Sequence, residues 1–431
     1  MGVTVIPQPR HVVEGDGRRA LVPAIPSIAD GHEPEGYVLE IDEHGIRIEA
    51  SDEAGLFYGE QTLRQLDTDG TVPFVRIEDA PRFAYRGAML DVARHFLPVE
   101  AVQRYIDDIA LLKLNHLHLH LTDDQGWRLE IPGWPELTGI GASTQVGGGG
   151  GGYYTAHDYR RIVEYAARRF VTILPEIDMP GHTNAAISAY PDLGDSPADP
   201  YEGIEVGFSS LAIGSERTYD FIADVTAAVA ALTPGPYLHL GGDESHATSE
   251  EDYLAFAERA TAIAARTGKT LVAWHELGRS RALPPGTIGQ YWGFVEPQDG
   301  ADALARSFVE QGGRLILSPA DAIYLDMKYE TDGELGLVWA NGPTTLERSY
   351  SWEPLDVVPG LTEHDILGVE APLWTETVTS IEDAEYLAFP RIASAAEIGW
   401  SPRDGRTFED FARRVRAFSD LLERLGIPYG P

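Results

Sequence analysis

The sequence predicts an α/β protein, a (β/α)8 barrel preceded by a small α+β domain. Eight short apolar segments recur through the later part of the chain, helical patterns lie between several of them, and a hairpin and helix pattern comes before them. Strands that alternate with helices form a parallel sheet, and eight such units close most simply into a barrel. A barrel takes up about 250 residues, so a chain of 431 residues has room for a smaller domain. We assign residues 1–80 to this accessory domain and residues 81–431 to the barrel.

The first domain shows the pattern of a β-hairpin followed by a helix. Apolar residues alternate in two runs within residues 36–51, on either side of a turn at 43–45, and a period of two is typical of half-buried strands. A helix is expected over residues 52–66 and a further strand over residues 71–77. Pro81 then interrupts the pattern and marks the boundary with the barrel. We expect the role of this domain to be structural.

The barrel strands are expected at short apolar runs separated by helical patterns. The eight runs are residues 87–93, 116–122, 172–178, 237–244, 270–275, 287–292, 314–319 and 366–374. The clearest helix begins near Tyr159, where apolar residues recur on one face up to Phe170, after a capping pair formed by Thr155 and Asp158. The glycine run 147–152 is too flexible for a strand or a helix and predicts a loop. That loop either borders a site or connects two elements at the surface.

The composition excludes several partners and several kinds of chemistry. The chain has 68 Asp and Glu against 33 Lys and Arg, a formal net charge of −35, which repels nucleic acid and anionic membranes and fits a small neutral substrate. It has no cysteine, so disulfides, thiolate metal sites and a cysteine nucleophile are excluded. No apolar run approaches the roughly 20 residues of a membrane span, and no export signal is evident. We expect a cytoplasmic protein, with export by a signal outside this sequence as the alternative, and leave its oligomeric state open.

Reactive side chains follow the predicted strands at the ends where the active site of a barrel lies. No single one identifies a site, because an isolated acid is usually solvated. Together they predict a pocket for a neutral sugar, whose C–H faces stack on aromatic rings and whose hydroxyls need hydrogen-bond partners. A phosphate ligand would need more cations. In chain order these residues are Arg94, Asp123, Asp124, Asp178, His182, Asp243, Glu244, Trp274, Trp292, Tyr324, Asp326, Trp374 and Glu376.

The neighbours Asp243 and Glu244 are candidates for a pair of catalytic carboxylates. Neighbouring side chains on an extended backbone point in different directions, so we expect two distinct roles and not one shared proton. Gly241 and Gly242 relax the backbone before them and would let both carboxylates address different atoms of one bound ring. The alternative is a solvated strand end.

His116, His118 and His120 alternate with leucines and therefore share one face of a predicted strand. They favour either a metal-dependent hydrolase with a His-x-His pair or a barrel interior filled by hydrogen-bonded neutral imidazoles.

The string Gly-Gly-Asp-Glu at residues 241–244 also occurs in nucleotide cyclases, but no lysine or arginine lies near it to bind a triphosphate. A glycan-binding protein without turnover is a further alternative, against which the presence of both carboxylates argues.

Seven motifs resemble those of the β-N-acetylhexosaminidases of glycoside hydrolase family 20. They occur in that family's order and cover essentially the whole barrel, and the first domain is similar to the family's companion α/β domain. The resemblance implies exo-acting, retaining hydrolysis of terminal non-reducing β-linked N-acetylglucosamine or N-acetylgalactosamine, with no metal or organic cofactor. The motifs are LDVARHF (90–96), HLHLTDDQGW (118–127), PEIDMPGH (175–182), HLGGDESH (239–246), QYWG (290–293), YLDMKY (324–329) and APLWTET (371–377).

The same resemblance implies substrate-assisted catalysis, in which the 2-acetamido oxygen of the substrate attacks its own anomeric carbon and forms an oxazolinium intermediate. Glu244 would protonate the leaving oxygen and later activate water, Asp243 would orient the acetamido N–H, and Tyr324 would bond the acetamido oxygen. The remaining positions carry binding roles. They are Trp274, Trp292 and Trp374 around the N-acetyl group, Arg94, Asp326 and Glu376 at ring hydroxyls, Asp178 and His182 beside Glu244, Asp123 in the site lining, and Trp339 at the sugar beyond the cleaved bond.

Overall fold

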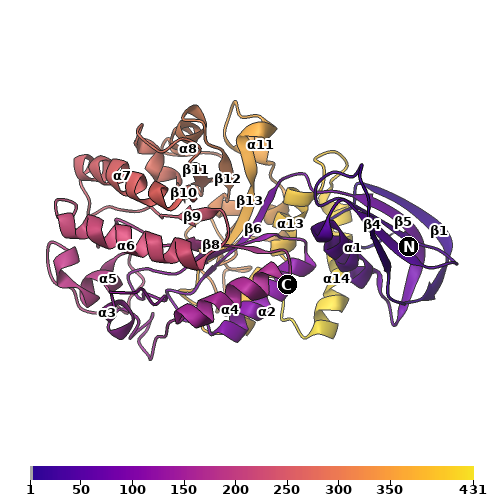
Figure 1. Ribbon diagram of the computed structural model, residues 1–431. Helices are drawn as coiled ribbons and strands as arrows, with labels where there is room; N and C mark the ends of the chain where they lie inside the picture. The colour runs from indigo at the N-terminus through magenta and orange to yellow at the C-terminus, as the bar shows by residue number, and fades with distance from the viewer. Residues whose placement is uncertain (1–2) are drawn as a thin grey trace.

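The computed structural model describes residues 3–431, in which a small sheet at the N-terminal end lies beside a larger closed barrel (Figure 1). The barrel consists of eight parallel strands in the order in which they occur along the chain, closed by pairing of the last strand with the first. The predicted fold class is therefore confirmed. The strands are β6 (Tyr85–Asp91), β7 (His116–His120), β8 (Thr172–Glu176), β9 (Tyr237–His239), β10 (Thr270–Trp274), β11 (Ile288–Tyr291), β12 (Leu315–Leu317) and β13 (Ile366–Leu373).

All eight predicted strands are present, but the fourth is shorter than its pattern indicated. We expected it over residues 237–244, and β9 ends at His239. Beyond it, Gly241 and Gly242 have φ angles of 66° and 105°, a backbone region incompatible with a strand. The two glycines turn the chain out of the sheet, and the apolar run that precedes them carried no signal of that turn.

Helices cover the outside of the barrel. The predicted helix after the glycine run is α4 (Ala156–Ala167), and Thr155 and Asp158 form the predicted capping box. Within residues 3–431, no helix is both long and apolar enough to cross a membrane. The other helices are α2 (Val99–Leu111), α3 (Glu136–Gly139), α5 (Asn184–Ala189), α6 (Glu216–Leu232), α7 (Glu250–Ala264), α8 (Ala301–Glu310), α9 (Ala320–Ile323), α10 (Leu346–Tyr350), α11 (Pro354–Val357), α12 (Ile381–Ala388), α13 (Ile392–Trp400) and α14 (Phe408–Leu425), with short 3₁₀ turns η1 (Pro191–Leu193), η2 (Ala265–Thr267), η3 (His275–Arg279) and η4 (Glu363–Asp365).

The small sheet has five strands in the order β1-β5-β3-β4-β2, and helix α1 (Glu53–Leu66) packs on one face. The predicted hairpin, helix and third strand are present. The sequence pattern missed β1 and β2 because nearly all of their residues are exposed, so no buried side chains alternate along them. The strands are β1 (His11–Ala20), β2 (Ile25–Ile28), β3 (Tyr37–Ile41), β4 (Ile46–Ala50) and β5 (Thr71–Asp79).

The small sheet is joined to the barrel through α13 and through buried ion pairs. Trp400, the last residue of α13, belongs to the apolar cluster of the small sheet and donates its indole N–H to Asp79 at 2.9 Å. Asp79 also pairs with Lys113 at 3.2 Å. Arg86 of β6 pairs with Glu35 at 2.9 Å. These contacts hold the small sheet against the side of the barrel, away from the carboxyl ends of its strands.

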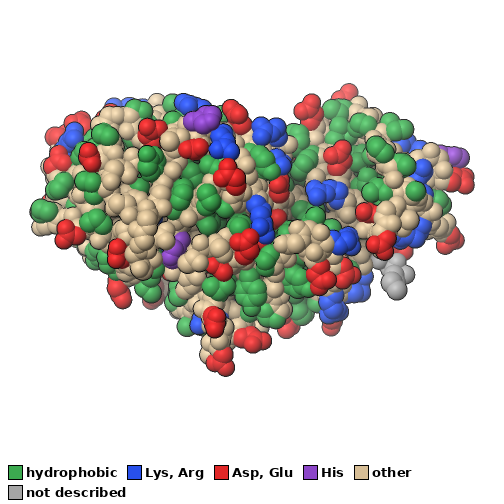
Figure 2. Space-filling model, turned by 90° about the horizontal axis from the view of Figure 1, so that it is seen from below, with side chains coloured by type: hydrophobic (Ala, Val, Ile, Leu, Met, Phe, Trp, Pro, Cys, Tyr) green, Lys and Arg blue, Asp and Glu red, His purple; other side chains and the backbone are tan. Residues whose placement is uncertain are grey.

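Acidic side chains are spread over the surface. Figure 2 shows Asp and Glu over both the barrel and the small sheet on the face that it draws, without one continuous acidic patch. This distribution fits the interpretation of the net charge of −35 as a solvated acidic surface.

Candidate active site

A pocket of about 290 Å³ opens at the carboxyl ends of the barrel strands. Its size lies near the lower end of small-ligand pockets, roughly 300–1,000 Å³, and suits a single sugar ring. Most of the predicted site residues line it. Among the others, Asp123 pairs with His182, Asp178 accepts from the amide of Gly242, Trp274 packs beside Trp374, and Asp326 lies near enough to Glu376 for the two charges to interact. The lining consists of Arg94, Ile204, Val206, Asp243, Glu244, Trp292, Tyr324, Leu337, Trp339, Trp374 and Glu376.

A tight turn after β9 brings Asp243 and Glu244 to the pocket. The amide N–H of Gly242 donates to Asp178 Oδ1 at 3.0 Å, and a Cβ on Gly241 would lie 1.6 Å from the same oxygen. Only glycine permits this close approach. Glu244 itself has a φ of 42°, a region that non-glycine residues seldom occupy and that is often found at active sites.

The predicted extended backbone is wrong at Glu244, and the side chains of Asp243 and Glu244 face one common group. Nε2 of His182 lies 3.7 Å from an oxygen of each carboxylate. Their surroundings still differ, because the side chain of Asp243 is 10% exposed and that of Glu244 is 30% exposed. Burial raises the pKa of Asp243 to about 7, with smaller contributions from the carboxylates of Glu276 and Glu244.

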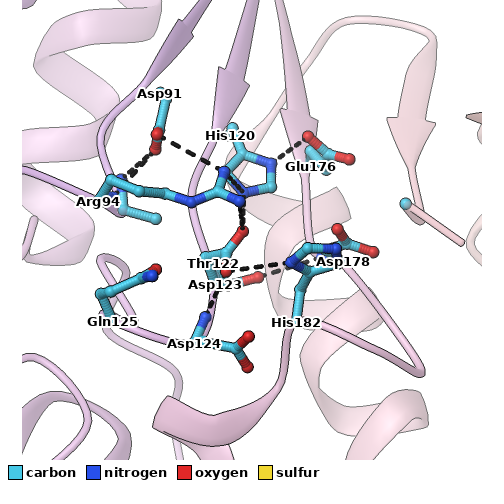
Figure 3. Close-up of polar contacts among 12 residues, drawn as sticks. Asp91, Arg94, His120, Thr122, Asp123, Asp124, Gln125, Glu176, Asp178 and His182 are labelled. Carbon is cyan, nitrogen blue, oxygen red and sulfur yellow. Dashed lines mark hydrogen bonds and ion pairs between the residues drawn. The ribbon is translucent and has the colours of Figure 1, made fainter. Parts of the chain in front are cut away.

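Asp123 and His182, whose contact is drawn in Figure 3, form a charged support next to the two carboxylates. Asp123 accepts from His182 Nδ1 at 3.2 Å and pairs with Arg94 at 2.8 Å. Although burial opposes it, the positive charges of Arg94 and His182 hold the pKa of Asp123 well below its usual range. Burial alone would lower the pKa of His182, but the carboxylates of Asp123, Asp178 and Asp243 raise it well above its usual value. His182 therefore presents a positive charge to the pair.

Buried carboxylates fix the indole rings of the pocket. Trp274 donates its indole N–H to Glu176 Oε1 at 2.8 Å, and Trp292 donates its own to Glu276 Oε2 at 2.9 Å. Burial raises the pKa of Glu276 to about 7. Neither glutamate was predicted as a site residue from the sequence. A signal was available, because a glutamate inside or directly after an apolar strand is seldom buried without a partner.

The rest of the aromatic wall is formed by rings from separate strand ends. The Trp274 and Trp374 rings lie 6.0 Å apart, and those of Tyr324 and Trp374 lie 6.3 Å apart, measured between centroids. Trp339 stands edge-on to Tyr324 at 5.7 Å and is 47% exposed at the rim. Ile204, Val206 and Leu337 also line the pocket and were not predicted, because isolated apolar residues in loops carry no pattern.

Two acids near the wall of the pocket have oxygens available for a ligand. Both oxygens of Asp326 and Oε2 of Glu376 are buried, with no hydrogen-bond partner among residues 3–431. Burial raises the pKa of Asp326 well above its usual value and also raises that of Glu376, despite the opposing charge of Arg94. Buried polar atoms in proteins are almost always paired, so these oxygens suit a hydroxyl-rich ligand.

The glycine run borders the site. Val146, directly before it, donates its amide N–H to the carbonyl of Arg94 at 2.9 Å, and Gly147 donates to the carbonyl of Glu202 at 2.8 Å. The loop therefore lies beside both the chain segment that carries Arg94 and the segment that carries Ile204 and Val206. These contacts support the interpretation of the glycine run as a loop that borders the site, and not as a connection at the surface alone.

The three histidines of β7 fill the barrel interior as hydrogen-bonded groups, as one of the two interpretations expected. His118 bonds Glu370 at 2.9 Å and His120 bonds Asp123 at 2.8 Å. The expectation that all are neutral is wrong, because neighbouring carboxylates outweigh burial and raise the pKa of His118 to about 9. His118, Glu176 and His239 lie close enough to hold a metal ion. In the structure, His118 Nε2 and His239 Nδ1 each lie 3.1 Å from an oxygen of Glu176.

Comparisons with known proteins match most of the chain. The model of the glycosyl hydrolase family 20 catalytic domain matches residues 83–403, and that of the family's domain 2 matches residues 24–80. A β-N-acetylhexosaminidase of Cellulomonas fimi is 43% identical over 91% of this chain and 79% of its own length. A β-hexosaminidase of Porphyromonas gingivalis is 36% identical over 92% of this chain and 54% of its own length.

Solved structures give the same result over nearly the whole chain. A family 20 β-N-acetylglucosaminidase has a TM-score of 0.96 at 51% identity, covering 100% of this chain and 98% of that one. The β-N-acetylhexosaminidase of Streptomyces coelicolor A3(2) has a TM-score of 0.95 at 42% identity, covering 99% and 97%. A mutant β-hexosaminidase of Streptomyces plicatus in complex with its product GlcNAc has a TM-score of 0.95 at 42% identity, covering 99% and 96%.

Proposed function

Since this chain belongs to glycoside hydrolase family 20, we propose that it removes terminal non-reducing β-linked N-acetylhexosamine by substrate-assisted catalysis. The β-hexosaminidases of this family hydrolyse N-acetylhexosamine glycosides, and residues 83–403 match the family's catalytic domain. The observation that carries the proposal is one pocket in which two carboxylates, a tyrosine and indole rings converge.

The first step forms a bond within the substrate. The acetamido oxygen attacks the anomeric carbon while the bond from that carbon to the leaving oxygen breaks, and Glu244 gives its proton to the leaving oxygen. The amide becomes part of an oxazolinium ring that carries a positive charge. Asp243 accepts a hydrogen bond from the amide N–H and stabilises that charge, while the hydroxyl of Tyr324 donates to the acetamido oxygen and orients it for attack.

The second step opens the ring with water. Glu244, now a carboxylate, takes a proton from the water while the water oxygen bonds to the anomeric carbon and the bond to the amide oxygen breaks. Because each step inverts the anomeric carbon, the product keeps the β configuration. The greater exposure of Glu244 supports this role, since it must contact both the leaving group and water, whereas the buried Asp243 suits an enclosed amide.

An exo mode of cleavage is supported by the buried polar groups at the wall of the pocket. The buried oxygens of Asp326 and Glu376, together with the guanidinium of Arg94, would bond the ring hydroxyls of a terminal sugar. The aromatic wall of Trp274, Trp292 and Trp374 would enclose the methyl group of the acetamide. Trp339, exposed at the rim, would contact the sugar beyond the cleaved bond.

The test compares two aryl β-glycosides that differ only in the 2-acetamido group. If the amide is the nucleophile, aryl N-acetyl-β-glucosaminide releases its chromophore and the plain aryl β-glucoside is nearly inert. Equal rates on both would remove the amide from the mechanism. Binding of N-acetylglucosamine without hydrolysis of either substrate would instead favour a glycan-binding protein.

A further inference from the structure

A row of alternating carboxylates and imidazoles runs through the barrel interior and ends beside the proposed catalytic pair. It begins at Glu370 on β13, includes two of the three histidines of β7, and reaches Asp123 and His182, part of which is drawn in Figure 3. All of its members are buried. The contacts are Glu370 to His118 at 2.9 Å, His118 to Glu176 at 3.1 Å, Glu176 to His120 at 2.5 Å, His120 to Asp123 at 2.8 Å, and Asp123 to His182 at 3.2 Å.

Glu176 is the branch point of this row. One of its oxygens faces Nδ1 of His120 and Nε2 of His118, and the other accepts the indole N–H of Trp274 at 2.8 Å. A carboxylate has only acceptor sites, about four of them, and can satisfy three N–H donors at once. A glutamine has one acceptor oxygen and would turn its amide N–H groups toward at least one of these donors.

The members of the row carry alternating charges. Burial alone would lower the pKa values of His118 and His120, but the carboxylates that flank them raise both. Burial would likewise raise the pKa of Glu176, and the imidazolium groups around it hold that pKa well below its usual range. Each charge therefore depends on its neighbours, and the loss of one leaves a buried charge uncompensated.

Two of the contact paths from Glu176 end at the pocket. One branch passes through His120 and Asp123 to His182, whose Nε2 lies 3.7 Å from Asp243 and from Glu244. The other branch fixes Trp274, which lies 6.0 Å from Trp374 in the aromatic wall.

We propose that Glu176 is a positioning residue for the reaction, which orients His120, Asp123 and His182 toward the catalytic carboxylates and holds Trp274 in the pocket wall. The proposal rests on the proposed function and goes beyond it, because it gives the histidine strand a role in the chemistry. The competing explanation is that Glu176 only stabilises the barrel core.

The first experiment measures kcat and KM of Glu176→Gln on aryl N-acetyl-β-glucosaminide. Its matched control is Glu397→Gln, the same change at another fully buried glutamate, which pairs with Arg414 far from the pocket. We expect kcat of Glu176→Gln to fall roughly 10- to 100-fold, as for other residues that orient a functional group from behind. KM should change less, because Asp326 and Glu376 still face the sugar, and kcat of Glu397→Gln should stay near that of the wild type. Parallel losses of kcat in both variants would overturn the proposal.

The second experiment reads the row directly by NMR of the ¹⁵N-labelled histidine rings at pH 7.5. His116 lies on the same strand but outside the row, and burial lowers its pKa to about 3, so it serves as the internal neutral reference. We expect imidazolium signals from His118 and His120 in the wild type and their loss in Glu176→Gln. Unchanged imidazolium signals in that variant would overturn the proposal.

If Glu176→Gln does not fold, His120→Gln and its control His116→Gln decide the question. A lowered kcat in His120→Gln alone supports the proposal, and equal kcat values overturn it. The NMR experiment does not depend on turnover. A wild-type chain that fails to cleave the aryl substrate would contradict the proposed function, and the histidine signals would still test the charges in the row.

Discussion

In the small domain the face of the sheet that packs on α1 is largely apolar, whereas the buried side chains at the mouth of the barrel are largely charged. Tyr37, Leu39 and Ile48 exemplify the first region, and Asp123, His182 and their neighbours in Figure 3 exemplify the second. Burial of apolar surface stabilises a fold directly. Burial of charge does so only when every charge is paired. The first region is therefore built for stability and the second for chemistry.

The backbone differs between the two regions in the same sense. Strands β3 and β4 of the small sheet pair in regular antiparallel register from Tyr37 to Ile41, whereas the barrel mouth holds His182 and Glu244 at φ angles of 55° and 42°. Such conformations cost on the order of 1–3 kcal/mol each and persist only where the surroundings enforce them. Substitutions should therefore separate the regions, with loss of activity in one and loss of stability in the other.

The largest effect is expected for Glu244→Gln. The substitution removes the group that gives a proton to the leaving oxygen and then accepts one from water, so kcat on aryl N-acetyl-β-glucosaminide should fall roughly 10²- to 10⁴-fold. The thermal midpoint should be nearly unchanged, because the side chain is partly exposed. Steady-state kinetics and a thermal melt check both parts. An unimpaired variant would remove Glu244 from the mechanism.

Ile48→Ala is expected to have the next largest effect. It should lower the free energy of unfolding and leave kcat unchanged, the reverse of Glu244→Gln. Ile48 is buried between the small sheet and α1, where its Cγ2 would lie 2.7 Å from a Cβ placed on Gly59. Truncation of a buried isoleucine typically costs roughly 2–5 kcal/mol of unfolding free energy. Denaturant unfolding measures that loss, and kcat at 25 °C should remain that of the wild type. A fall of kcat in the folded variant would mean that the small domain shapes the site.

The same contrast explains what sequence patterns predict. The eight barrel strands and the hairpin of the small domain were predictable because their apolar residues follow the period of the element. The position of the site was predictable because polar residues follow several strands, and parallel strands end at a common edge. In both cases the information lies in a local pattern along the chain.

What patterns did not predict depends on contacts between distant segments. Glu176 and Glu276 look like ordinary strand-end acids, and their role as acceptors for Trp274 and Trp292 appears only when the barrel closes. The turn at Gly241 required knowledge that Asp178, from another strand, approaches that backbone. Strands β1 and β2 were missed for the opposite reason, since their exposed residues have no inward face.

A further prediction concerns the pH dependence of the free energy of unfolding, to which the buried Asp243 contributes. Burial raises its pKa to about 7, against about 3.9 when unfolded, so the folded state holds the proton more tightly between these values. The corresponding stability is fully present below about pH 4 and is lost as the pH rises through about 7. Asp243→Asn should therefore be more stable than the wild type at pH 8, by on the order of 1–4 kcal/mol, although inactive.

Unfolding free energies measured from pH 4 to pH 8 test this prediction, with Asp42→Asn as the control. Asp42 lies partly exposed in the hairpin turn of the small domain, and its hydrogen bond with Arg47 lowers its pKa. The contribution of Asp42 to the free energy of unfolding therefore has the opposite sign. It is present above the pKa of the unfolded state and is lost as the pH falls. Asp42→Asn should accordingly gain no stability at pH 8. A parallel pH dependence for wild type and Asp243→Asn would contradict the assignment.

The smallest effect is expected at the rim, for Trp339→Ala. The ring is 47% exposed and stands edge-on to Trp292 and Tyr324, so its free face can stack on the sugar beyond the cleaved bond. Loss of one aromatic contact of about 0.5–1.5 kcal/mol should lower kcat/KM for a β-linked N-acetylglucosamine disaccharide roughly 2- to 10-fold. A methyl glycoside has no second ring and should be cleaved as by the wild type. Tyr386→Ala, at an exposed aromatic residue on α12, should change neither value, and an equal loss on both substrates would place Trp339 within the pocket for the terminal sugar.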